Sequence, residues 1–331
     1  MHWATLLSFF VLIIPQCINA QEKHPHDSSY YTVYPHTLTT RIFLSKKYTS
    51  VTLPSIDDQA TDIKYKSNEK MSLGLGFTYN NFSLNAGAGL GFLNPKDPGK
   101  GDTKSFDLQL RLYPYKWAID ALAIFNKGHY LDPEGYGASY ANTYYLRPDI
   151  KLGLAGVSAY HVPNAAKFSY HAAMIQNEWQ KKSAGSLLIG GQAYYGSVKG
   201  DSALVPAQLD KSFQQSGVDR FSFFSAGPGI GYAYTLVIDK HFFLMGSAVA
   251  NVDLNYTMED GANLSANKFS VTFIPVFKTA VGYNSNKWDI SLNWAGNVAW
   301  IGSAVSAESY FFQTGNYRLI FARRINLKKR S

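Results

Sequence analysis

Four polar residues near the middle of the chain could build a hydrolytic site. They are His161, Asn164, Ser169 and His171. A serine hydroxyl becomes a nucleophile when a histidine accepts its proton and an Asn, Asp or Glu side chain orients that histidine. If the segment is a strand, Ser169 and His171 share one face. Because the spacing lacks a compact His-x-Ser arrangement, a lipid hydrolase or deacylase is our alternative interpretation, and our first expectation is that none of these residues is catalytic.

A second set of residues could line a polar interior. Its members are charged and occupy polar positions of segments in which apolar and polar residues alternate: Asp107, Arg111, Asp120, Asp253 and Lys278. Inside a barrel, charges of both signs pair across strands and fill the space. Alternatively, they line a path for solutes and set its selectivity. The sequence leaves both interpretations open, and we favour pairing.

Cofactor chemistry has little support in the sequence. His24 and His26 lack a third ligand at fixed spacing, so we expect no metal site. The glycines of residues 227–231 lie inside a strand pattern, so they do not form a dinucleotide-binding loop, and we expect no cofactor. The formal net charge is +8, but Lys and Arg are spread along the chain. We therefore expect no nucleic acid partner.

The elements that would position these residues are strands. Residues 71–79, 82–92 and 105–112 alternate between apolar side chains and small or polar ones. Successive side chains of a strand point to opposite faces, so each segment has one apolar face. Segments of about 9 to 11 residues are long enough for a tilted strand to cross a bilayer. The sequence therefore predicts an all-β fold, namely a transmembrane outer-membrane β-barrel of antiparallel strands.

Composition and the N-terminus agree with this interpretation. Charged residues make up only 16% of the 331 residues, against about 25% in soluble domains. Residues 3–14 form a short apolar run, so we expect residues 1–20 to be a signal peptide that is cleaved after Ala20. That peptide would contain Cys17, the only cysteine. We therefore expect a protein of the Gram-negative outer membrane, with the lipids of that membrane and the barrel-assembly machinery as partners.

Turn-forming residues divide the rest of the chain. We expect an irregular leader over residues 21–37 and a single barrel domain over 38–331. Short turns of such barrels face the periplasm, whereas longer loops lie outside. The short connections are 80–81, 113–116, 239–240 and 284–287, and the long ones are 94–101, 131–145, 197–219 and 256–266. We expect about 12 strands, and residues 161–185 must hold either no membrane strand or two.

Five short stretches carry a family resemblance: Lys46–Ser50, Lys104–Leu108, Arg147–Asp149, Lys167–Tyr170 and Ser183–Ser186. They resemble a family of predicted outer-membrane barrel proteins, of the Bacteroidota type, that is known only as a domain of unknown function. The resemblance covers nearly the whole mature chain. It implies a barrel fold and an outer-membrane location, and it assigns no catalytic residue. The function we expect is therefore non-enzymatic: passage or binding of a small solute or lipid, or a structural role in the envelope.

Overall fold

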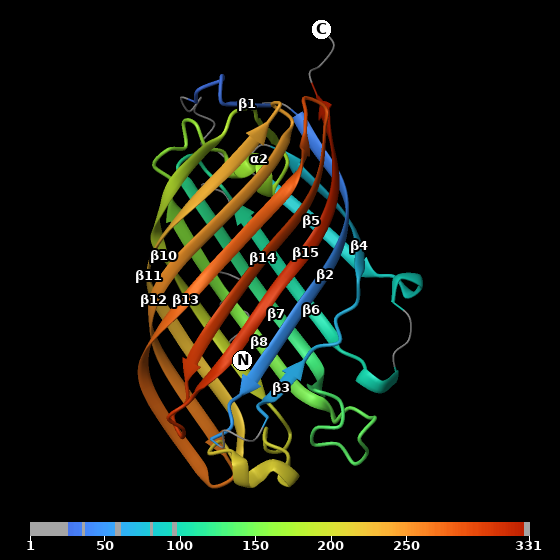
Figure 1. The fold of residues 1–331 in the computed structure, drawn as a ribbon, viewed down its shortest axis with the longest axis vertical. Coiled ribbons are helices and arrows are strands. Elements are labelled where there is room, and N and C mark those ends of the chain that lie inside the picture. Colours follow the sequence, from blue (N-terminus) through green and yellow to red (C-terminus); the bar gives the residue numbers. More distant parts are fainter. Residues whose placement is uncertain (1–25, 35–36, 57–60, 80–81, 95–97, 328–331) are drawn as a thin grey trace.

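The computed structural model describes residues 26–34, 37–56, 61–79, 82–94 and 98–327. The expected signal peptide, its cleavage after Ala20 and the turn at 80–81 lie outside these residues. In the described part, long strands form a tall barrel (Figure 1). None of the described helices is long and apolar enough to cross a membrane.

Fifteen strands, one α-helix and three 3-10 helices make up the described secondary structure. The strands are β1 (Tyr31–Val33), β2 (Thr37–Leu53), β3 (Ile63–Lys66), β4 (Ser72–Tyr79), β5 (Phe82–Gly89), β6 (Lys104–Leu112), β7 (Trp117–Asp132), β8 (Leu146–His161), β9 (Glu178–Gln180), β10 (Ala184–Lys199), β11 (Val218–Ile238), β12 (Phe242–Gly261), β13 (Leu264–Asn284), β14 (Trp288–Gly302) and β15 (Ser309–Asn326). The helices are α2 (Tyr170–Met174), η1 (Gly91–Leu93), η2 (Pro98–Lys100) and η3 (Ala207–Ser212).

Ten strands close the barrel through antiparallel ladders. Their order is β2, β15, β14, β13, β12, β11, β10, β8, β7 and β3, and β3 pairs back with β2. Three further strands, β4, β5 and β6, lie between β2 and β7. β4 and β5 extend from β2, whereas β6 extends from β7. If β3 is left out, the wall therefore contains twelve strands. Among the described strands, β5 pairs only with β4, and β6 pairs only with β7.

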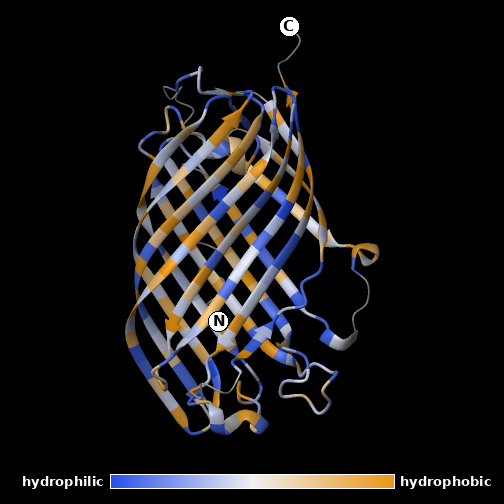
Figure 2. Cartoon of the chain, viewed as in Figure 1, coloured by the Kyte–Doolittle hydropathy of each residue, from blue (hydrophilic) through white to orange (hydrophobic). Residues whose placement is uncertain are grey.

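The outer surface of the barrel is apolar, as the alternation predicts. Leu75 is 66% exposed and Leu108 is 57% exposed, while Thr78 and Ser83 on the opposite face are buried. Figure 2 shows hydrophobic and hydrophilic residues alternating along the strands. A closed barrel with an exposed apolar wall is the β-structure that can span a bilayer. The all-β fold, an antiparallel outer-membrane barrel of about 12 strands, is confirmed.

The two ends of the barrel differ in their connections. The end that holds α2 has the short turns after β6, β11 and β13 together with residues 162–183 between β8 and β10, and the opposite end has the long connections after β7 and β10. The prediction of a long connection at 256–266 is wrong, because β12 and β13 pair from Gly261 and Leu264 onward. The polar residues of this segment indicated a loop, but they belong to strands. Glu259, for example, is buried and accepts the backbone N–H of Ala304 at 2.8 Å.

The barrel interior is filled by side chains in three zones. An apolar cluster that includes Tyr65, Phe221 and Tyr310 fills the end with the long connections. A second apolar cluster, which includes Phe168 and Met174, fills the end with α2. Polar and charged side chains lie between the two clusters. Cavities among these interior side chains measure about 80 and 30 Å³, which is space for a few water molecules.

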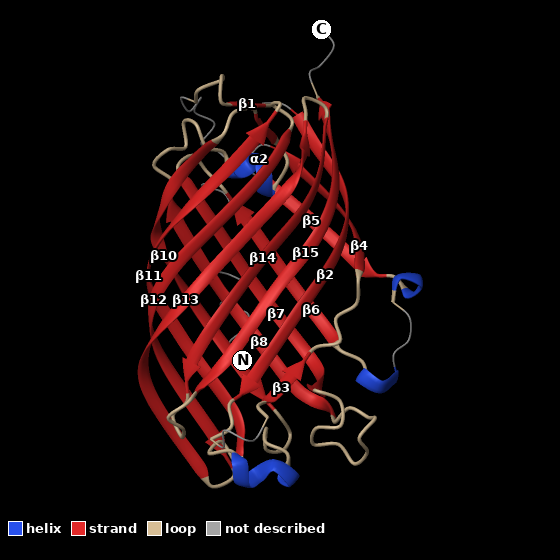
Figure 3. Cartoon of the chain, viewed as in Figure 1, coloured by secondary structure: helices blue, strands red, loops and turns tan. Residues whose placement is uncertain are grey.

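Residues 162–183 contain no membrane strand, which resolves the alternative left open by the sequence. They hold α2, which lies inside the barrel, and β9 (Figure 3). β9 pairs with β1, so part of the expected irregular leader is ordered as a strand against this segment. We call residues 162–183 the plug segment.

Two glycines are required by close approaches of the backbone. A Cβ atom at Gly74 would lie 2.2 Å from the ring of Phe43, so the small residue makes room for this neighbouring side chain. Gly128 has a φ of +91° and lies where the β7–β8 register shifts. A Cβ atom there would meet the carbonyl oxygen of Asp102 at 2.3 Å. The glycine thus permits a bulge that brings the β5–β6 connection close to β7.

Candidate functional site

A cavity of about 550 Å³ opens in the wall where β5 and β6 fail to pair. Small residues such as Gly87 and Ala88 line it from β5, and Phe106 lines it from β6. Phe43 and Arg318 reach it from β2 and β15. Unpaired strand edges leave backbone N–H and C=O groups without ladder partners. We call this feature the seam cavity.

Charges next to the seam cavity form a network across strands. Asp120 lies at its centre: its carboxylate pairs with Lys278, accepts the Tyr113 hydroxyl at 3.0 Å and lies 3.7 Å from the Arg111 Nε. These side chains are at most one-fifth exposed. The network places three of the five predicted interior residues in direct contact.

The other two predicted interior residues also face inward. Asp107 forms an ion pair of 2.8 Å with Lys47, and its side chain is 8% exposed. Asp253 is fully buried and accepts the Ser225 hydroxyl at 2.7 Å and the Gln192 amide at 3.0 Å. Asp253 therefore does not join the charged network: both neutral donors bind its Oδ2 atom, and its Oδ1 atom is buried without a hydrogen-bond partner.

Arg318 differs from these residues because it has no acidic partner. Its guanidinium lies over the ring of Phe43, 4.6 Å from the ring centroid. Its Nε atom is buried without a hydrogen-bond partner, and no ion pair within 4.0 Å joins it to a carboxylate of the described residues. Four cationic side chains line the seam cavity (Lys47, Lys70, Arg111 and Arg318), against two anionic ones (Glu69 and Asp107). The cavity therefore has an excess of positive charge.

The sequence-based prediction did not include Arg318, although the two-residue alternation along β15 could have identified it. On β15, Tyr317, Leu319 and Phe321 are exposed, whereas Ile320 and Ala322 are buried. The two-residue period of a strand then places the even-numbered arginines of this segment inside the barrel.

The plug segment is held inside the barrel by its backbone carbonyl groups. Ser169 caps α2 by accepting the N–H of Ala172 at 3.0 Å. Four side chains from four strands donate to carbonyls at the other end of the helix: Asn293 to Ala173 (3.1 Å), Arg111 to Met174 (3.2 Å), Arg41 to Ile175 (2.8 Å) and Arg324 to Gln176 (2.7 Å). Cations at a helix C-terminus also interact favourably with the helix dipole.

Tyr170 completes this attachment on the opposite side of α2. Its hydroxyl forms a hydrogen bond of 2.6 Å with the Ser247 hydroxyl of β12. Burial raises the pKa of Tyr170 above its usual value, so the phenol stays protonated. The plug segment is therefore tied to strands all around the barrel.

The geometry separates the residues of the hydrolytic alternative. Ser169 begins a helix and not a strand, and its hydroxyl donates to the carboxylate of Glu178. His171 pairs through Nδ1 with the Asn177 side chain at 3.0 Å and through Nε2 with a backbone carbonyl. Among the described residues, no hydrogen bond joins the Ser169 hydroxyl to a histidine.

His161 and Asn164 lie apart from this pair. The His161 ring contacts Trp117 edge-on at a centroid distance of 5.4 Å. The Asn164 amide donates to the carbonyl of Gly185 at 2.7 Å. All four residues therefore have partners that explain them as structural groups.

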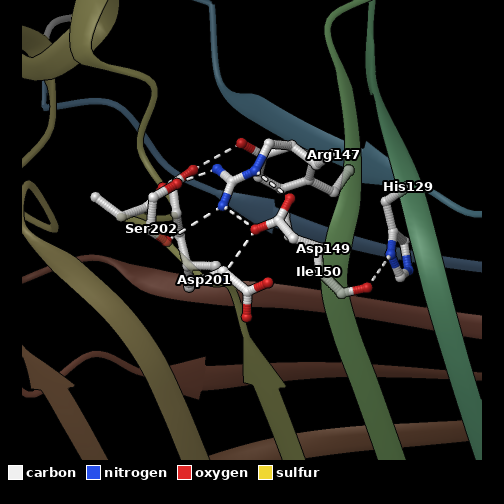
Figure 4. A network of polar contacts seen from close by, with 9 residues as sticks. His129, Arg147, Asp149, Ile150, Asp201 and Ser202 are labelled. Carbon is white, nitrogen blue, oxygen red and sulfur yellow. Dashed lines mark hydrogen bonds and ion pairs between the residues drawn. The ribbon is translucent and has the colours of Figure 1, made fainter.

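A separate polar network ties the connection after β10 to β8 (Figure 4). Arg147 donates to both oxygens of Asp149 at 2.8 and 2.7 Å, and it also donates to the carbonyl of Ala203 at 2.8 Å. Asp149 in turn accepts the backbone N–H of Asp201 at 2.9 Å. A bidentate pair of this kind fixes the geometry of both side chains. The network therefore holds this connection against the barrel wall.

Comparison with known families places the chain. The family described as Domain of unknown function (DUF4421) matches residues 25–320. The chain belongs to this family. Among curated proteins, none matches the sequence. The family relationship thus agrees with the resemblance of the short sequence stretches, and it assigns no chemistry to the seam cavity.

Solved structures similar to this family member are outer-membrane proteins. The outer membrane protease OmpT from Escherichia coli has a TM-score of 0.39 and 9% identity, with 89% of this chain and 98% of that chain covered. The COG4313 outer membrane channel from Pseudomonas putida F1 has a TM-score of 0.29 and 9% identity, with 92% and 100% covered.

Proposed function

We propose that this barrel is a non-enzymatic protein that binds a small amphiphile with an anionic head group through the seam cavity. The observation that carries the proposal is Arg318, a cation with no carboxylate of the described residues within 4.0 Å, which lines a cavity between two strands that do not pair with each other. Arg318 is half-buried with its Nε atom fully buried, and a charge withdrawn from water is costly unless it is paired. A carboxylate or phosphate from a ligand would supply the missing partner.

The surroundings of Arg318 support an amphiphile over a purely polar solute. Phe106 lines the seam cavity and is 62% exposed toward the outside of the barrel. The head group would contact the interior cations, and the apolar chain would leave between Ala88 and Phe106 toward the bilayer. Because β3 joins β2 to β7, the ring of ten strands stays closed while the ligand occupies the seam.

Binding of oleate to the purified protein in detergent tests this proposal. Arg318→Gln should weaken oleate binding about 10- to 150-fold, since a hydrogen bond to a charged group contributes about 1.5 to 3 kcal/mol. Arg323→Gln changes an exposed residue of the same strand and should leave binding unchanged. Equal affinity of the wild-type protein for oleate and its methyl ester would refute the role of the cation, and absence of oleate binding would refute the proposal.

We also propose that export removes residues 1–20 and that the barrel-assembly machinery inserts the mature chain. The apolar run and the small residue Ala20 support this cleavage position. Mass spectrometry of protein from the outer-membrane fraction should find Gln21 at the N-terminus. A mature chain that retains Cys17 would contradict the cleavage position.

A further inference from the structure

Five basic residues lie side by side on five neighbouring strands. The register of the ladders pairs them in one row: Lys104 of β6, Lys127 of β7, Lys151 of β8, Lys199 of β10 and Arg220 of β11. Neighbouring strands are about 4.8 Å apart, so the row extends over about 19 Å of the wall. We call these residues the basic row.

The basic row faces outward at the edge of the apolar wall. Four of the five residues are exposed, and Lys151 is half-buried. Phe106 and Phe125 lie on the same outer face, two residues along their strands from Lys104 and Lys127. They pair with each other across β6 and β7 and are 62% and 43% exposed. The basic row lies on the side of these rings that is closer to the long connections. A molecule that contacts both the row and the rings must therefore be charged at one end and apolar at the other.

The basic row has no acidic partner in the described structure. None of its five side chains forms an ion pair within 4.0 Å or a side-chain hydrogen bond among the described residues. The nearby carboxylate of Asp149 is already bound by Arg147, and Asp260 lies opposite Arg220 at one end of the row only. Like charges directly opposite each other on neighbouring strands are destabilising. Neutralisation by an external anion would remove this repulsion.

We propose that the basic row binds the phosphate groups of lipids in the membrane leaflet next to the long connections. Lysine and arginine side chains at a membrane surface attract anionic head groups, and the exposed rings of Phe106 and Phe125 contact the acyl chains. In the orientation expected from the connection lengths, this leaflet is the outer one. Its phosphorylated glycolipid is the ligand to which we commit. The basic row is distinct from the seam cavity and does not depend on the function proposed for it.

Binding of diphosphoryl lipid A to the detergent-solubilised full-length protein, followed by native mass spectrometry, tests this inference. Lys127→Gln combined with Lys151→Gln should weaken binding about 30-fold, since each charge near an anionic lipid surface contributes about fivefold. A second pair, Lys199→Gln with Arg220→Gln, should have a similar effect. Retained heat-modifiable migration in gel electrophoresis will show that the variants are folded.

A matched control changes two exposed cations at the other end of the barrel. Lys287→Gln combined with Arg323→Gln removes the same net charge and should leave lipid A binding unchanged. Equal losses in the control and in the row variants would show that only net charge matters and would overturn the inference. Unchanged binding in both row variants would overturn it as well. Full competition by inorganic phosphate would show that the row takes a free anion and would refute a lipid ligand.

Discussion

Removal of the Arg324 guanidinium should release the plug segment without unfolding the barrel. This side chain donates to the carbonyl of Gln176 at 2.7 Å, to the carbonyl of Glu178 at 2.8 Å and to the Asn284 side chain at 3.0 Å, and it also binds the carbonyl of Ser285. Two of these four acceptors belong to the plug segment. Hydrogen bonds to charged groups contribute about 1.5 to 3 kcal/mol. Because the same Nη2 nitrogen contacts both carbonyls of the plug segment, we count them as one such interaction and expect Arg324→Gln to lower the free energy of plug release by about that amount.

The rate of thiol labelling measures this release. Ala173 is 1% exposed, so Ala173→Cys reacts only when the plug segment leaves the barrel. The mature chain provides no competing thiol if Cys17 is removed with the signal peptide. The expected free-energy change corresponds to labelling that is about 10- to 150-fold faster in the Arg324→Gln background. Arg323→Gln, an exposed neighbour on the same strand, is the control and should leave the rate unchanged.

A reporter at the far end of the barrel separates release of the plug segment from global unfolding. Leu204 is fully buried in the apolar cluster at the end with the long connections. A thiol introduced by Leu204→Cys should react at the same slow rate with and without Arg324→Gln. Equal acceleration at both reporters would mean that the arginine stabilises the whole barrel, and unchanged labelling at Ala173→Cys would refute the anchoring role.

Three further predictions follow from the fold. Leu75→Arg should destabilise the barrel by about 2 to 4 kcal/mol in urea titrations in lipid vesicles, whereas Gln109→Arg on the inner face should cost less; equal costs would argue against lipid exposure. Ser169→Ala should lower the free energy of unfolding by about 1 kcal/mol through loss of the helix cap and leave any esterase activity unchanged. Loss of hydrolysis in this variant would instead support the catalytic interpretation. An impermeant thiol reagent should label Gln214→Cys on intact cells but Asn286→Cys only after the outer membrane is breached, and the reverse pattern would invert the barrel.

The barrel could be predicted from sequence because its determinant is local. In residues 71–79 and 105–112 a two-residue period is visible without knowledge of any partner strand. The same period placed Asp107, Arg111 and Asp120 on the inner face, where Asp107 pairs with Lys47 and Asp120 contacts Arg111 and Lys278. Cross-strand contacts of this kind follow once the register is known.

Features that depend on pairing or on tertiary contacts could not be predicted. The gap between β5 and β6 leaves no trace in either segment, because both alternate like paired strands. The helix α2 has only five residues, too few to be stable alone. Arginine side chains from distant strands hold it in place. The error at 256–266 has a similar origin, since buried Glu259 is satisfied by a connection that is far away in sequence.

The joining of β2 to β7 by the four residues of β3 has a consequence for how the protein fluctuates. Apart from the short ladders of β3, the closed ring of ten strands contains long continuous ladders, so the amides of those ladders should exchange with solvent deuterium only through rare global opening. β5 and the β6 edge that faces it lie outside that ring and can open as a separate cooperative unit. Amides of the ten-strand ring should therefore exchange slowly, and amides of β5 and of the facing edge of β6 should exchange fast. Mutations in β5 or at that edge should change local exchange rates while leaving the melting temperature of the ring nearly constant.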